Sequence, residues 1–290
     1  MSSPSGGASP NAANVQYWNE VLVARFERFR SLFVETSDAH SRGPIERAGL
    51  APGMRVLDVG CGFGETTLQL AGHVRPGGSV LGTDCCPPFL DTARADARRA
   101  GIANAEFEVA DAQSCHFEPE FDLAFARFGT MFFESPVAGM GNIRSALVPG
   151  GRLLMVVWAP LESNPWLGFA KAVAQRHLPS RREEAPGSRP EPFSMSDPDV
   201  VTGILASAGY TDVRFERTTE TVRVGPSVEE ALAFQLAIGP AAEIIREAPA
   251  EAAHARAAIE AELRAVLERH ARADGVWMQT SSWAVSASSP

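Results

Sequence analysis

Residues 55–64 read RVLDVGCGFG, a short apolar run that leads into three glycines at alternate positions. The run from Arg55 to Gly60 predicts a buried β-strand, and residues 66–74 (TTLQLAGHV) predict a helix just after it. Between the two, glycines let the backbone pass close to a ligand and adopt dihedral angles closed to other residues. The G-x-G-x-G spacing and the acidic Glu65 at the helix start argue against the G-x-G-x-x-G turn that binds a dinucleotide pyrophosphate. The stretch therefore predicts a strand, a ligand-binding turn and a helix.

The alternation of strands and helices continues after this turn. Further strands are expected at residues 79–84, 105–109, 121–126 and 152–158, with helices at 88–100 and 136–147. Strands and helices that alternate at this spacing predict βαβ units and a parallel sheet with right-handed crossovers. The expected fold class is therefore α/β, with a doubly wound, mostly parallel sheet.

The segments on either side of this core differ from it in composition and periodicity. Residues 1–14 are rich in Ser, Gly, Pro and Ala and lack the basic and apolar regions of a signal peptide, which predicts a disordered tail. Apolar residues at steps of three and four predict an N-terminal helical lid over residues 15–53, with helices at 15–33 and 44–48, ahead of a core at 54–158. Residues 159–290 are expected to form cap helices and the last sheet strands, with helices at 166–177, 198–208, 228–247 and 250–273, a loop at 180–192, and strands at 212–224 and 282–287.

Composition limits the classes of function that the chain can have. Its 290 residues carry a formal net charge of −9, without a basic stripe that would neutralise phosphates, so no nucleic-acid partner is expected. No uninterrupted apolar stretch reaches the about 20 residues that span a bilayer, so we expect no membrane partner and a cytoplasmic location. The four cysteines form no C-x-x-C pair, so neither a disulfide framework nor a metal site is expected.

Acidic residues end the next two strands. Asp84 is the last residue of the strand at 79–84, and Asp111 follows the strand at 105–109. An ionised carboxylate is acceptor-only, so Asp84 can accept hydrogen bonds from two neighbouring hydroxyls of a ligand. With the glycine turn and the segments FDLAFARFG (121–129) and PGGRLLMVVW (149–158), these residues resemble the class I S-adenosylmethionine-dependent methyltransferases, and their UbiE-like subset in particular, over about residues 17–166. The resemblance implies a Rossmann-like sheet of seven mostly parallel strands with helical cap insertions.

The resemblance also implies S-adenosyl-L-methionine as the cofactor. Asp58 would bind the amino group of the methionine part, and Thr66 or Thr67 its carboxylate. Asp111 would bind the exocyclic amine of adenine, and the backbone amide of Ala112 a ring nitrogen. The cofactor-binding residues that we expect are Asp58, Gly60, Gly62, Gly64, Thr66, Asp84, Cys85, Asp111, Ala112 and Arg127.

Aromatic segments near the ligand edge of the sheet predict the walls of an acceptor pocket. The residues expected there are Tyr17, Trp18, Phe128, Met131, Phe132, Trp158 and Trp166. An oxygen or carbon nucleophile needs a base that removes its proton. His40, just before the core, and His177, at the end of a helix, are the candidates, whereas a thiolate or an amine would need no such base.

The function expected from these features is transfer of a methyl group from S-adenosylmethionine to a small organic molecule. A natural-product setting and O- or C-methylation are favoured, because helices beyond the minimal fold commonly enclose small substrates. Methylation of protein or RNA, and a non-catalytic partner subunit that only binds the cofactor, remain as alternatives. The helices after residue 228 could instead serve only to form a homodimer.

Overall fold

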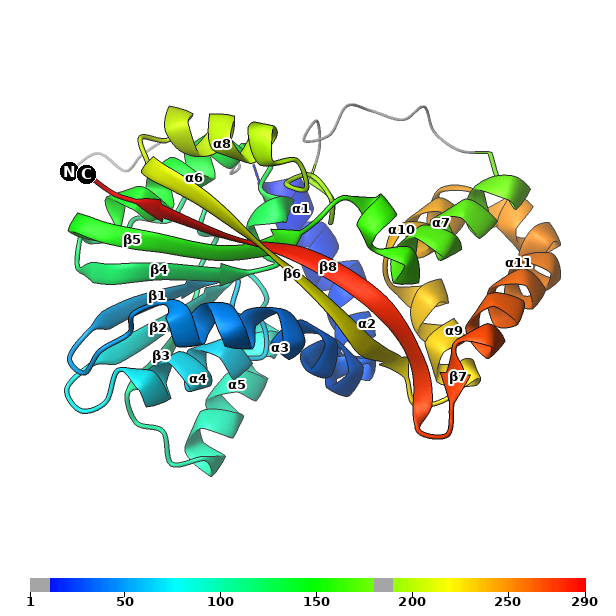
Figure 1. Ribbon diagram of the computed structural model, residues 1–290, viewed down its shortest axis with the longest axis horizontal. Coiled ribbons are helices and arrows are strands. Elements are labelled where there is room, and N and C mark those ends of the chain that lie inside the picture. The colour runs from blue at the N-terminus through cyan, green and yellow to red at the C-terminus, as the bar shows by residue number, and fades with distance from the viewer. Residues whose placement is uncertain (1–10, 180–189) are drawn as a thin grey trace.

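A computed structural model describes residues 11–179 and 190–290, and its centre is a twisted sheet (Figure 1). The strands are β1 (Arg55–Val59), β2 (Ser79–Asp84), β3 (Ala105–Val109), β4 (Phe121–Arg127), β5 (Leu147–Trp158), β6 (Thr211–Gly225), β7 (Ala271–Arg272) and β8 (Gly275–Ser288). Seven of them lie in the order β3-β2-β1-β4-β5-β8-β6, and the short β7 pairs with β8. The α/β class and the mostly parallel sheet predicted from the sequence are confirmed.

The direction of the strands follows from their connections. Strands β1 to β5 pair in parallel, whereas β8 is antiparallel to both β5 and β6. The four residues of β1 after Arg55 are buried, as its apolar sequence requires at the centre of a covered sheet. The chain first winds outward from β1 to β3 and then returns to β4 on the other side of β1. Ligands of open α/β sheets bind at such a reversal, at the carboxyl ends of the strands.

Helices cover both faces of the sheet (Figure 1). They are α3 (Arg30–Arg47), α4 (Glu65–His73) and α5 (Pro87–Arg99) on one face, and α6 (Pro136–Ser145) and α8 (Pro198–Ser207) on the other. The short helix expected at residues 44–48 is the last turn of α3, which continues through Pro44. Buried Leu32, His40 and Ile45 hold α3 in place, and this packing keeps the helix continuous through Pro44.

The N-terminal helices begin earlier than the sequence predicts. Helix α1 (Ala12–Tyr17) starts within the segment 1–14 that was expected to be a disordered tail, so that prediction is wrong for residues 12–14. Residues 1–10 lie outside the described part of the chain. After α1 come a π-helical turn at residues 18–22 and α2 (Val23–Arg28), which ends at Phe29 before α3 starts. This arrangement places the N-terminal helices beside the carboxyl ends of the strands.

Four helices form a cap at the far end of the long β6 and β8 strands (Figure 1). They are α7 (Pro165–His177), α9 (Val228–Ala237), α10 (Pro240–Glu247) and α11 (Pro249–Arg269). The single helix expected at 228–247 is in fact two, because Gly239 has φ of +98° and Pro240 starts α10. The helix expected to reach residue 273 ends at Arg269, where the β7–β8 hairpin begins. The loop expected at 180–192 falls largely on residues 180–189, outside the described residues.

One hydrophobic cluster joins these parts. It contains Leu22 from the N-terminal helices, Leu57 from the sheet, and Trp166, Phe234 and Leu263 from the cap. None of the helices described combines the length and apolar character needed to cross a bilayer.

Candidate active site

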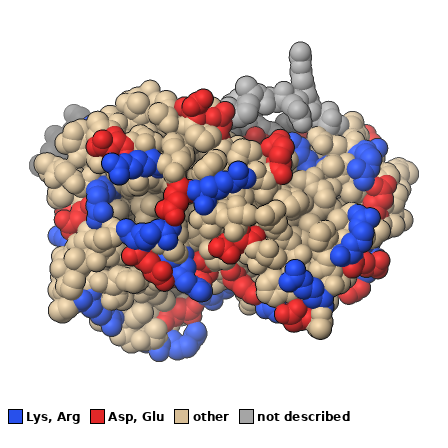
Figure 2. All heavy atoms as spheres, in the orientation of Figure 1, with Lys and Arg blue, Asp and Glu red and all other residues tan. Residues whose placement is uncertain are grey.

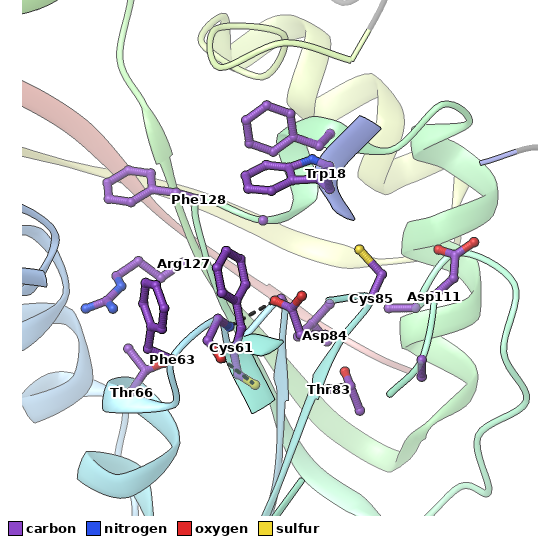
Figure 3. A pocket seen from close by; sticks show the side chains of 18 of the residues that line it. Trp18, Cys61, Phe63, Thr66, Thr83, Asp84, Cys85, Asp111, Arg127 and Phe128 are labelled. Carbon is purple, nitrogen blue, oxygen red and sulfur yellow. Dashed lines mark hydrogen bonds between the residues drawn. The ribbon is translucent and has the colours of Figure 1, made fainter. Parts of the chain in front are cut away.

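A pocket opens at the carboxyl ends of β1, β2 and β4, where the strand order reverses (Figure 3). It holds about 930 Å³ of empty space, including its open mouth. Arg127 and Thr66 lie at one end, Asp111 and Cys85 at the other, and Asp84 lies between them (Figure 3). The pocket therefore brings together eight of the ten predicted cofactor residues: Gly60, Gly62, Thr66, Asp84, Cys85, Asp111, Ala112 and Arg127.

The glycine turn connects β1 to α4 with three left-handed residues. Gly60, Gly62 and Gly64 have φ of 65°, 54° and 82°. Gly60 and Gly62 line the pocket, whereas Gly64 begins α4 and lies outside the lining. A Cβ at Gly64 would lie 2.7 Å from the Cβ of Ala93 in α5, so this glycine serves the close approach of two helices. The turn thus presents bare backbone to the pocket at two of its three glycines.

Asp84 lies at the end of β2 with both carboxylate oxygens held by backbone. The N–H of Gly62 donates to Oδ2 and the N–H of Cys86 to Oδ1, each over 2.9 Å. Burial raises the pKa of Asp84, and the backbone donors oppose that rise. A carboxylate has about four acceptor positions, so this side chain can accept further hydrogen bonds from a ligand. Its position and chemistry fit the two ribose hydroxyls of a nucleoside.

Asp58 lies beneath the pocket rather than in its wall. Its Oδ2 accepts hydrogen bonds from the hydroxyls of Thr66 and Thr67, over 2.7 and 2.6 Å. Its Oδ1 is buried without a hydrogen-bond partner among the described residues. Burial raises the pKa of Asp58 to about 6. A buried oxygen without a donor is uncommon, and it leaves an acceptor beside the glycine turn for a donor group such as the ammonium of the cofactor.

Arg127 and Phe128 close the opposite side of the turn. The Nη1 of Arg127 donates to the hydroxyl of Ser41 over 3.2 Å. Burial lowers the pKa of this guanidinium, and the negative charges of Glu65 and Asp58 oppose that effect. Phe128 has φ of 57°, which is costly for a residue with a side chain and is found mostly at functional sites. The site therefore has a half-buried cation at the end where the methionine carboxylate of the cofactor is expected.

The end of the pocket near Asp111 includes two residues that the sequence analysis missed. Oδ1 of Asp111 accepts hydrogen bonds from the N–H of Gln113 over 3.1 Å and from Nδ2 of Asn11 over 3.0 Å. Asn14 also lines the pocket, and its Nδ2 donates to the carbonyl oxygen of Phe132 over 2.6 Å. Both asparagines were assigned to a tail because of the Ser/Gly/Pro-rich segment before them. Positions 11, 14 and 18 are separated by three and four residues, which places their side chains on one face of a helix. This spacing was the available signal that the asparagines lie beside Trp18.

Neither of the two histidines predicted as bases is among the residues that line the pocket. His40 is fully buried, and its ring nitrogens lie 2.7 Å from the hydroxyl of Thr280 and 2.9 Å from that of Ser282. Burial lowers the pKa of His40 to about 4. His177 ends α7 in the cap, where its Nε2 lies 2.7 Å from a carboxylate oxygen of Glu262. Their contacts are those of a buried structural residue and of a cap residue hydrogen-bonded to a neighbouring helix, so neither position supports a role as base.

Three of the seven residues predicted for the acceptor pocket do line it, namely Trp18, Phe128 and Phe132. Further aromatic residues join them from the N-terminal helices, the glycine turn, α5 and the segment after β4: Phe26, Phe33, Phe63, Phe89 and Phe133. Three of them, Phe26, Phe33 and Phe89, lie on helices, where apolar residues are more often part of the core than of a pocket. Aromatic residues therefore make up a large part of the pocket lining.

The other four predicted acceptor residues lie outside the pocket lining. Trp158 is buried behind Phe128, with ring centroids 3.9 Å apart and planes 12° from parallel. Met131 is buried, and Trp166 is buried with its Nε1 donating to Asn164. The hydroxyl of Tyr17 donates to Glu243 of α10 over 2.5 Å. These residues support the pocket or join the cap to the N-terminal helices.

The cysteines near the pocket are free thiols. The ligand atoms of Asp84, Cys85 and Cys86 lie within 4.8 Å of one another, with Cys86 buried. The Asp84 oxygens already accept two backbone hydrogen bonds. Cys85 lines the pocket near Asp111, where its polarisable sulfur can pack against a flat base.

The fold and the pocket together define a nucleoside-binding enzyme of the Rossmann-like class. Residues 56–151 match the protein family described as methyltransferase domain. Demethylmenaquinone methyltransferase of Thermus thermophilus is 30% identical over 183 residues, which are 57% of this chain and 77% of that protein. The chain belongs to the class I S-adenosylmethionine-dependent methyltransferases, of the UbiE-like subset, and its cofactor is S-adenosyl-L-methionine.

Two further similarities show how widely this fold is shared. An uncharacterized protein of Mycobacterium tuberculosis is 29% identical over 200 residues, 64% of this chain and 70% of that protein. The crystal structure of the YcgJ protein from Bacillus subtilis has a TM-score of 0.57 at 17% identity and covers 86% of this chain and 97% of that one. At that identity the second similarity concerns the fold alone.

Proposed function

We propose that this methyltransferase transfers its methyl group to an oxygen or carbon atom of a small, largely apolar molecule, in natural-product metabolism. The observation that carries the proposal is the large aromatic share of the pocket lining next to the cofactor residues. It includes Trp18 and Phe26 of the N-terminal helices and Phe128 after β4. An aromatic pocket wall suits an apolar acceptor better than a peptide or RNA chain.

The surface charge supports the same choice. Figure 2 shows Lys and Arg interspersed with Asp and Glu over the visible face, rather than gathered in one basic patch. The net charge is −9. RNA and DNA binding depends on clustered positive charge that neutralises phosphates. The pocket, rather than this face, is therefore our proposed acceptor site.

The roles of the pocket residues follow from their chemistry. When bound, S-adenosylmethionine supplies a methyl group made electrophilic by its sulfonium. Asp84 would accept hydrogen bonds from the ribose hydroxyls, and Arg127 would pair with the methionine carboxylate. Phe128 and the other aromatic residues exclude water and present electron-rich faces that favour a cation. These residues accelerate transfer mainly by holding the reacting atoms in line, an effect that reaches about 7–11 kcal/mol in well-oriented systems.

The acceptor must release a proton if its nucleophile is a hydroxyl or a carbon acid. Among the described residues that line the pocket there is no histidine. Glu65 lines it, but a carboxylate oxygen of Glu65 lies 2.8 Å from Nη2 of Arg30. We therefore favour an acceptor that is acidic by its own electronic structure, such as a phenol or an enol. Such an acceptor would ionise before it enters the pocket, so no residue of the lining would have to remove its proton.

A panel of acceptors tests this proposal. The purified chain would be incubated with S-adenosylmethionine and small phenols, enols and isoprenoids, or with peptides and RNA, and S-adenosylhomocysteine would be measured by mass spectrometry. We expect turnover with members of the first group. Phe33→Ala should then lower kcat/KM for that acceptor about tenfold, while Phe215→Ala, whose ring packs on Trp283, serves as the control. Turnover with peptide or RNA alone would overturn the proposal.

A further inference from the structure

The first helices of the chain form part of the pocket wall. Asn14 of α1, Trp18 of the π-helical turn and Phe26 of α2 all line the pocket. We call residues 12–28, which run from the start of α1 to the end of α2, the N-terminal arm. Because the arm supplies wall residues along its length, any movement of it changes how open the pocket is.

A latch of three residues joins the arm to the cap, and none of the three lines the pocket. The hydroxyl of Tyr17 donates to Oε1 of Glu243 in α10 over 2.5 Å. Nε and Nη2 of Arg246 donate to Oε2 of the same carboxylate over 3.0 and 2.6 Å. The guanidinium carbon of Arg246 also lies 5.1 Å from the centre of the Tyr17 ring, which is within the range of a cation–π contact. Arg246 thus holds the carboxylate so that its other oxygen meets the arm.

The latch differs in strength from the contacts that the arm makes with the core. Nδ2 of Asn14 and Nδ2 of Asn19 donate to the carbonyl oxygens of Phe132 and Cys85, which are neutral acceptors. Hydrogen bonds to a charged group are roughly twice as strong as bonds between neutral groups. Burial, together with the hydrogen bond to Glu243, raises the pKa of Tyr17 to about 12, so its hydroxyl remains a donor near neutral pH. The bond to Glu243 is therefore a major restraint on the arm.

The other end of the arm has a break about which it can move. Helix α2 ends at Phe29, whose φ of −104° and ψ of 19° are not helical. Phe29 is buried, and its ring meets that of Phe234 in α9 edge to face at 5.5 Å. One turn earlier, Nη1 of Arg25 donates to the carbonyl oxygen of Ala237 over 3.0 Å. Hinges are commonly residues at the ends of elements. The arm is thus anchored at its hinge, whereas the latch at its start involves Glu243, whose side chain is 35% exposed and open to competition from water.

We propose that Glu243 is a gating residue, which holds the N-terminal arm closed through Tyr17 and must release it for a ligand to enter or leave the pocket. Opening the latch frees Trp18, the next residue along the arm, to leave the lining. Since the latch residues do not line the pocket, the latch favours the closed arm equally with and without a ligand. An interaction that does not distinguish the free from the bound protein leaves the affinity unchanged. Loss of the latch therefore raises the rates of binding and release by the same factor.

Stopped-flow tryptophan fluorescence with S-adenosylhomocysteine as the probe measures both rates. Tyr17→Phe keeps the ring beside Arg246 and removes only the hydroxyl, and Glu243→Ala removes the acceptor. We expect each variant to raise the association and dissociation rate constants together, by about threefold to tenfold, with Kd within about twofold of wild type. Glu262→Ala is the matched control, because its carboxylate accepts from His177 within the cap and should affect neither rate.

The double variant Tyr17→Phe/Glu243→Ala distinguishes one latch from two separate effects. Its rates should equal those of either single variant, because both changes remove the same bond. Unchanged rates in both single variants would overturn the proposal, as would faster release with unchanged association, since that result indicates a lost ligand contact. The Tm of each variant establishes that it is folded before mixing. The probe is the product of the cofactor, so the result does not depend on which acceptor the protein methylates.

Discussion

At the scale of single residues, buried ionisable groups set how the protein responds to pH. Burial, and to a lesser degree the charge of Arg127, lowers the pKa of His40 from 6.5 to about 4. The unfolded chain takes up a proton below pH 6.5, whereas the folded chain resists it until about pH 4. The stability that His40 contributes is therefore complete above pH 6.5 and is lost as the pH falls towards 4. The shift corresponds to about 3 kcal/mol.

Replacing His40 with Gln should flatten this dependence. Gln keeps polar atoms for Thr280 and Ser282 but does not titrate. Asp58, whose raised pKa of about 6 acts in the opposite direction in an overlapping range, is present in both proteins. Urea unfolding between pH 7 and 4.5 would measure the difference, with His177→Gln as a surface control. Parallel curves for His40→Gln and wild type would contradict the prediction.

A second residue-scale prediction concerns Asp84. Asp84→Asn keeps the shape of the side chain but removes its charge and half of its acceptor oxygens. It should weaken S-adenosylhomocysteine binding by roughly tenfold to a hundredfold, since hydrogen bonds to charged groups contribute about 1.5–3 kcal/mol each. Calorimetry measures the affinity, and Asp91→Asn, an exposed residue of α5, is the control. Unchanged affinity in Asp84→Asn would refute its assignment to the ribose.

At the scale of elements, the glycine turn separates two tasks. Gly62 and Gly64 both have positive φ, so an alanine at either position costs about 1–2 kcal/mol in backbone strain. Nothing lies within 4 Å of a Cβ at Gly62, whereas one at Gly64 meets Ala93 at 2.7 Å and Phe107 at 2.9 Å. Strain is therefore shared by the two sites, and steric conflict is confined to Gly64.

Gly64→Ala should accordingly lower the free energy of unfolding by about 1–3 kcal/mol more than Gly62→Ala. Gly62→Ala should act mainly on cofactor affinity, because backbone strain at this residue shifts the N–H that holds Asp84 at the pocket. Urea unfolding and calorimetry on the same two variants give both quantities. An equal loss of stability in the two variants would mean that the α4–α5 contact yields to the added methyl group.

The elements also show how far the sequence predicts the fold and the site. Strong local signals sufficed for β1 and its glycine turn, and for Asp84 and Asp111 at the following strand ends. Features of the fold and the site that depend on tertiary contacts were not predicted. Helix α3 passes through Pro44 because its buried face packs on the sheet, and Asn11 reaches the pocket only because α1 folds over it. Local composition carries no information about such long-range contacts.

At the scale of the whole molecule, the cap and the core share one interior. Strands β6 and β8 pair from Thr211↔Ser288 beside β5 to Gly225↔Val276 at the cap. The hydrophobic cluster continues from Leu57 in the sheet to Leu263 in α11, which is fully buried. Because the cap and the core pack around the same hydrophobic cluster, we expect them to unfold in one cooperative transition rather than as independent units.

Leu263→Ala tests this cooperativity from the cap side. Removing a fully buried leucine side chain should lower the free energy of unfolding by about 2–5 kcal/mol. If unfolding is shared, the slowest-exchanging amides of β1 and of α11 lose the same protection in hydrogen exchange followed by mass spectrometry. Arg256→Ala, which changes an exposed residue on the same helix, should leave both sets unchanged. Loss of protection confined to α11 would instead mean that the cap opens alone, and acceptor entry could then proceed without disturbing the cofactor site.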